Sequence, residues 1–182
     1  MNLNDFSDEE LLARIQEGDT TVIEFLLAKY LQGIFSVSFR ICGDTDDAND
    51  ITQNVCLKIM KHIKTFRKES EIKTWIYRIA YTESLLFIKW RREFIELDDV
   101  EPYIGEPDTY DVDEKDARIL IQKSINTLSC VDKSIILFYY YDDLKIRQIA
   151  DILNINENTV KTRLSRAKLR LQPLLESLWK HL

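Results

Sequence analysis

The stretch ILNINENTVKTRLSRAKLRL, residues 152–171, decides how the C-terminal half of the chain folds. It holds five lysines and arginines and one acidic residue, although the whole chain has a formal net charge of −6. On a helix that turns about 100° per residue, its regularly spaced apolar residues fall on one narrow side. They are Val160, Leu164, Ala167 and Leu171. The pattern predicts a helix that packs through this stripe and presents a basic, polar surface on its other sides.

A shorter helix is expected directly before it. The segment IRQIADIL, residues 146–153, carries its apolar residues on one side, and only residues 154–156 separate the two helices. Asn156 stands where an N-cap is needed. A short helix, a three-residue turn and a longer polar helix are typical of a DNA-binding helix-turn-helix. A basic helix that simply faces solvent remains open at this point.

Composition favours a helical, cytoplasmic protein. The 182 residues are 45% hydrophobic and include only four glycines and three prolines. We expect no apolar run of membrane-spanning length, and the first residues lack a signal-peptide pattern. Cys42, Cys56 and Cys130 match no metal-binding spacing and are expected to be buried, reduced thiols. No metal or cofactor is therefore expected.

An acidic segment divides the chain into two parts. Residues 96–116 contain ten acidic residues against one lysine, and they hold two of the three prolines. This composition is typical of a linker. We therefore expect an all-α protein with two small helical domains, residues 7–95 and 117–182, joined by the linker 96–116.

Capping residues place the helices of the first domain. Ser7 and Glu10 form a predicted capping box, and Gly18 is expected to end that helix. A second helix follows from about residue 21, a third restarts after Gly43, and Ser70 is expected to cap a fourth. In the second domain, helices are expected over about 116–128, 132–141, 146–153 and 157–178.

The C-terminal half carries a family resemblance. Residues 128–171, LSCVDKSIILFYYYDDLKIRQIADILNINENTVKTRLSRAKLRL, resemble the promoter-reading domain of the extracytoplasmic-function sigma factors of bacterial RNA polymerase. TVKTR followed by LSRA is the most specific part. Ser129 replaces the family's common proline, and Lys145 stands where a Ser or Thr N-cap is common. The resemblance implies that the last helix reads the upstream (−35) promoter element through Asn158, Thr159, Lys161, Thr162, Arg163, Arg166 and Lys168.

The N-terminal half is similar to the same family. GDTDDANDITQNV, residues 43–55, resembles the segment by which these sigma factors bind the clamp helices of core polymerase. Asn49 and Asn54 stand where acids are usual. The resemblance implies a polymerase-binding surface formed by Asp47, Asp50, Gln53, Asn54 and Leu57.

The following segment, TFRKESEIKTWIYRIAYTESLLFIKWRRE, residues 65–93, resembles the family's element that recognises and melts the −10 box. Binding separated DNA strands requires aromatic side chains that stack on the bases and cations that neutralise the phosphate backbone. Tyr77 and Tyr81 are further candidates for the stacking role. Thr82 and Leu86 replace the family's frequent Asn and Asp. The implied contacts are Phe66, Arg67, Lys68, Ser70, Lys73, Trp75, Arg78 and Thr82.

Together these resemblances imply a non-catalytic specificity subunit. Its expected partners are core RNA polymerase, promoter DNA and an anti-sigma factor, with no membrane insertion. The alternative is a stand-alone helix-turn-helix regulator that binds DNA without polymerase. An enzyme has little support, because the chain has only two histidines and no glycine-rich phosphate loop.

Overall fold

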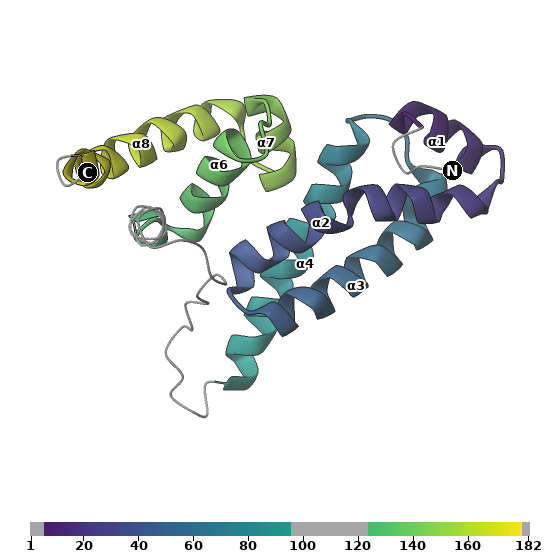
Figure 1. Ribbon diagram of the computed structural model, residues 1–182, viewed down its shortest axis with the longest axis horizontal. Helices are drawn as coiled ribbons and strands as arrows, with labels where there is room; N and C mark the ends of the chain where they lie inside the picture. Colours follow the sequence, from purple (N-terminus) through teal and green to yellow (C-terminus); the bar gives the residue numbers. More distant parts are fainter. Residues whose placement is uncertain (1–5, 96–123, 180–182) are drawn as a thin grey trace. The chain divides into compact units, whose positions relative to one another are not determined.

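The computed structural model describes residues 6–95 and 124–179, which belong to two compact units (Figure 1). The units divide at Gly105 and Glu106. The predicted linker and most of the helix predicted over 116–128 lie outside the described residues. The described elements are α1 (Asp8–Gln16), η1 (Thr20–Val22), α2 (Ile23–Cys42), α3 (Thr45–His62), η2 (Ile63–Thr65), α4 (Ile72–Ile95), α6 (Cys130–Tyr140), α7 (Ile146–Leu153) and α8 (Glu157–Trp179).

The N-terminal unit is built on three long helices. α2, α3 and α4 pack against one another, and α1 packs against α2 (Figure 1). Their core is made of aliphatic side chains that recur at helical spacing on each element. The largest fully buried ones are Leu11, Ile15, Leu26, Ile34, Ile51, Ile59, Ile63 and Ile76.

Local capping chemistry sets most of the helix ends in this unit. Ser7 and Glu10 form the predicted capping box, with Glu10 N–H donating to Ser7 Oγ at 3.2 Å. Gly18 follows α1 with φ at +100°, and Gly43 ends α2 with φ at +78°, a conformation that glycine adopts without strain. The predicted cap at Ser70 is wrong by one residue. α4 begins at Ile72, so Glu71 is the residue that precedes it, and its carbonyl accepts from Trp75 N–H at 3.1 Å.

The C-terminal unit has the predicted helix-turn-helix. α7 and α8 pack against each other, and α6 packs against both. Asn154 ends α7 in the left-handed conformation, with φ at 54°, which asparagine tolerates better than most residues. The predicted stripe of α8 is buried, from Val160 at 0% exposure to Leu171 at 7%.

Helix α2 has an unusually apolar sequence. Residues 20–42, which include α2, have the length and composition of a membrane-spanning helix. By these two criteria, the expectation that the chain has no apolar run of membrane-spanning length is wrong. In this protein α2 lies among α1, α3 and α4, and it buries Leu26, Ile34 and Val37. It is therefore the core helix of the N-terminal unit.

The cysteines differ from the expectation of burial. Cys42 and Cys56 are half-buried, Cys130 is exposed, and none of the three forms a disulfide. Burial raises the pKa of Cys42 and of Cys56, which keeps both protonated near neutral pH.

α4 lies close to α2 at Gly33. A Cβ added there would overlap the Tyr77 hydroxyl oxygen and would lie 3.0 Å from Tyr77 Cε1. We predict that Gly33→Ala destabilises the protein by about 1–2 kcal/mol, because overpacking exceeds the gain in helix propensity. Urea unfolding measures this. Adding Tyr77→Phe should recover part of the lost stability, because it removes the overlapping hydroxyl. If the double variant recovers none of it, overlap with that hydroxyl is not the cause.

α7 lacks an acceptor at its N-cap. Lys145 offers no side-chain oxygen, and only the Gln148 side chain closes the turn, through Oε1, which accepts from Lys145 N–H at 2.8 Å. We predict that Lys145→Ser stabilises the protein by about 1 kcal/mol, because the serine oxygen can accept from a first-turn N–H. Lys145→Ala is the matched control in thermal unfolding. Equal gains in both variants would mean that the charge, and not the cap, is responsible.

Candidate nucleic-acid interface

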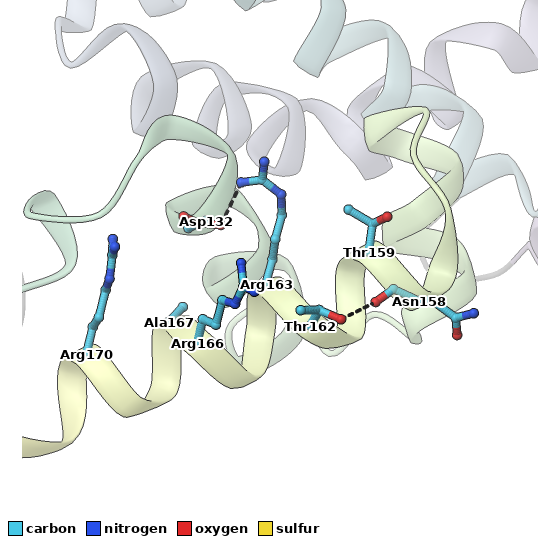
Figure 2. A pocket seen from close by; sticks show the side chains of 8 residues that line it. All are labelled: Asp132, Asn158, Thr159, Thr162, Arg163, Arg166, Ala167 and Arg170. Atoms are coloured by element: carbon cyan, nitrogen blue, oxygen red, sulfur yellow. Dashed lines mark hydrogen bonds and ion pairs between the residues drawn. The ribbon is translucent and has the colours of Figure 1, made fainter.

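A groove of about 480 Å³ runs along the N-terminal half of α8 beside α6 (Figure 2). Seven of its lining residues come from α8 and one from α6, and three of them are arginines. Arg163 and Arg170 extend from the same side of the helix in Figure 2. The lining residues are Asp132, Asn158, Thr159, Thr162, Arg163, Arg166, Ala167 and Arg170. The surface therefore combines cations with amide and hydroxyl groups, the chemistry that reads base edges.

The first turn of α8 fixes the hydrogen-bonding groups of this groove. Asn156 caps the helix, with its Oδ1 accepting from Asn158 N–H at 2.7 Å. Thr162 Oγ1 donates to the Asn158 carbonyl at 2.8 Å. Because this bond uses the hydroxyl hydrogen, the free lone pairs of Thr162 Oγ1 can accept from the amino group of adenine or cytosine.

The sequence-predicted contacts on α8 are exposed with a single exception. Arg163 is half-buried, and its Nη1 donates to Asp132 Oδ1 of α6 at 3.0 Å. Sequence reasoning missed Asp132, which lies 31 residues earlier on another helix. The exposed predicted contacts are Asn158, Thr159, Lys161, Thr162, Arg166 and Lys168.

Lys168 lies outside the groove and has aromatic neighbours. Its Nζ is 5.2 Å from the Tyr139 ring centroid and 5.1 Å from that of Tyr140. A hydrogen bond with the Tyr140 hydroxyl raises the pKa of Lys168, so the ammonium stays charged at physiological pH. The two rings favour the cation and hold it on the side of α8 away from the arginines.

The residues predicted for the −10 element occupy different depths in the N-terminal unit. Phe66 is only 8% exposed, and its ring lies 5.3 Å from that of Trp75. Its carbonyl also accepts from Gln16 Nε2 at 3.3 Å. The expectation that Phe66 offers its ring to a base therefore does not fit the structure. Tyr77 and Tyr81 are each 5% exposed, so they too belong to the core.

The polar members of that set remain accessible. Arg67 and Lys68 are exposed in the loop before α4, and Lys68 has φ at 57°, outside the conformation that most side chains prefer. Ser70, Lys73 and Trp75 are half-buried, while Arg78 and Thr82 are exposed on α4. Thr82 Oγ1 donates to the Arg78 carbonyl at 2.8 Å, so its oxygen, like that of Thr162, is left to accept.

The predicted polymerase-binding surface lies on α3. Asp50, Gln53 and Asn54 are exposed, and Leu57 is 62% exposed despite its apolar side chain. Asp47 differs from these four, because its carboxylate forms an ion pair with Arg91 of α4.

The environment of Asp47 is partly apolar. Burial raises the pKa of its carboxyl, and Arg91 opposes that effect. The Arg91 guanidinium of α4 is thus directed toward α3.

Two family models match this chain. The Sigma-70 region 2 model matches residues 26–92, and the Sigma-70, region 4 model matches residues 118–171. The chain is 31% identical over 144 residues to the RNA polymerase sigma factor SigV of Bacillus subtilis, covering 78% of this chain and 83% of SigV. It is 28% identical to the ECF RNA polymerase sigma-E factor of Haemophilus influenzae, covering 93% of this chain and 97% of that protein.

The chain belongs to the extracytoplasmic-function family of RNA polymerase sigma factors. Its fold is similar to that of the sigma factor RpoE in complex with the anti-sigma factor NepR from Bartonella quintana. The TM-score is 0.70 at 24% identity, covering 84% of this chain and 96% of that one. Sigma factors direct bacterial core polymerase to promoters, so this protein is a DNA-binding transcription initiation factor.

Two departures from the family pattern have clear structural settings in this sigma factor. Ser129, in place of the common proline, caps α6 by accepting from Asp132 N–H at 3.2 Å. Leu86, in place of a common Asp, is 53% exposed, so the substitution adds apolar surface to α4 and does not fill the core.

The exposed guanidinium of Arg166 in the groove can pair with a guanine edge. We predict that Arg166→Ala costs about 1–3 kcal/mol in promoter binding and relaxes the sequence preference at one upstream position. Competition binding of the holoenzyme to single-base variants of the upstream element measures both. Lys161→Ala is the comparison variant and should weaken all sequences alike. An equal loss on all sequences for Arg166→Ala would contradict base readout.

Proposed function

We propose that the two units of this sigma factor divide promoter recognition between them. α8 reads the −35 element in the major groove. The N-terminal unit binds core polymerase through α3 and recognises and melts the −10 element through the loop before α4 and the exposed side of α4. The chain itself performs no chemistry, and it acts in the cytoplasm.

The α6–α8 groove carries this proposal. It places Asn158, Thr162 and Arg166 together on the outward side of a capped helix whose opposite side is buried. The N-terminal end of such a helix supplies positive potential near the DNA backbone, in addition to the side-chain cations. A basic helix that merely faced solvent would need no such grouping of base-reading side chains.

The N-terminal unit supports the second half of the proposal. Arg67 and Lys68 can neutralise phosphates of the separated strands, and Trp75, half-buried against Phe66, is the aromatic residue of the predicted set that stays partly exposed. Phe66 then supports Trp75 from beneath. This assignment replaces direct stacking on Phe66.

Control by an anti-sigma factor is part of the proposal. The RpoE structure that this fold resembles contains an anti-sigma factor, NepR. In this chain, exposed apolar side chains on α3 and α4 supply surface that such a protein could cover. These are Leu57, Met60, Leu85, Leu86 and Trp90.

Binding to core polymerase is tested through Leu57. We predict that Leu57→Arg lowers affinity for core polymerase at least tenfold, because a hydrophobic anchor becomes an unmatched charge, and that run-off transcription falls accordingly. Leu31→Arg is the matched control, since Leu31 is also an exposed leucine, at 48%, but lies on α2.

The same experiment separates the alternative function. A wild-type chain that neither binds core polymerase nor changes its initiation would overturn the proposal. Promoter footprints produced without polymerase, together with a dimer in gel filtration, would indicate a stand-alone regulator.

A further inference from the structure

Asp132 belongs to α6, yet its carboxylate lines the groove of α8 (Figure 2). The side chain is 16% exposed. Both of its oxygens have a partner. Ser129 Oγ donates to Oδ2 at 2.7 Å, and Arg163 Nη1 donates to Oδ1 at 3.0 Å. Ser129 and the first turn of α6 therefore fix the carboxylate, and the carboxylate in turn fixes the guanidinium.

This contact makes Arg163 different from the other arginines of the groove. Arg166 and Arg170 form no ion pair within the part of the chain that the structure describes. A guanidinium has five N–H donors, so Arg163 keeps donors for DNA after it binds Asp132. Its charge, however, is already opposed by the carboxylate before any phosphate approaches.

Non-specific DNA binding depends on phosphate neutralisation, whereas specific binding also uses base edges. A carboxylate paired with Arg163 weakens non-specific binding more than specific binding, because it offsets the charge with which Arg163 would attract any phosphate. It also keeps the guanidinium in one orientation for a matching site.

We propose that Asp132 is a positioning residue for promoter recognition, which holds Arg163 at the groove and limits its binding to DNA of arbitrary sequence. This role rests on the proposed reading of the −35 element by α8. Asp132 acts through Arg163 and touches no base itself. If Asp132 only joined α6 to α8, its removal would change folding stability and would not change the balance between specific and non-specific binding.

The test compares full-length variants in fluorescence anisotropy with a short duplex of mixed sequence over a salt series. Asp132→Asn should bind this duplex about fivefold more tightly, a typical effect of one surface ion pair. The slope of log K against log salt should steepen by about one unit, as expected for one more phosphate contact. On an upstream-element duplex defined by run-off transcription the gain should be smaller, so the specificity ratio falls.

Three further variants make the result decisive. In an Arg163→Ala background, Asp132→Asn should have no effect on duplex affinity, because the residue acts through Arg163. Asp132→Glu should retain most of the wild-type specificity ratio. Asp151→Asn removes the same charge from an exposed site on α7 outside the groove lining, and it should leave the ratio unchanged.

The proposal is overturned by any of three results. Asp151→Asn could match Asp132→Asn, which would make net charge the cause. The gain could persist without Arg163. Asp132→Asn could instead weaken both duplexes in parallel with a lower melting temperature. Run-off transcription by the wild-type chain separates the two proposals. A chain that directs initiation but shows no Arg163-dependent gain overturns this role and leaves promoter reading intact, whereas a chain that directs no initiation overturns promoter reading itself.

Discussion

The burial of one apolar stripe on α8 is the constraint on which the C-terminal unit depends. Val160, Leu164 and Ala167 are at most 6% exposed, and they pack in a unit where α6 and α7 both contact α8. A helix has one rotation about its axis that buries such a stripe. That rotation turns Asn158, Thr162 and Arg166 outward, so hydrophobic packing determines which side chains are available to DNA.

Acidic side chains in this protein also control where its cations act. Asp47 pairs with Arg91 across α3 and α4, and Asp132 pairs with Arg163 across α6 and α8. Lys168 is held by two tyrosine rings instead. The chain has a formal net charge of −6, yet its positive charge is localised on particular surfaces. Elsewhere, neighbouring acidic side chains offset the charge of its lysines and arginines.

Periodicity and capping residues predicted the helices well, since both signals are local. The capping box at Ser7, the restart after Gly43 and the turn before Asn156 all depend on residues within four positions of one another. The burial of Phe66 and the pairing of Asp132 with Arg163 could not be predicted in this way. Each depends on a side chain from another element, Trp75 in one case and Arg163 in the other, and helical spacing carries no information about such contacts.

The close packing of α2 and α4 links the interior of the N-terminal unit to its surface chemistry. Tyr77 fills the space that the missing side chain of Gly33 leaves, and the ring of Tyr77 lies 5.5 Å from the ammonium of Lys73. Lys73 is among the residues predicted to contact the melted strands. The missing side chain at Gly33 thus determines where the Tyr77 ring can lie, and through that ring it bears on the position of the Lys73 ammonium.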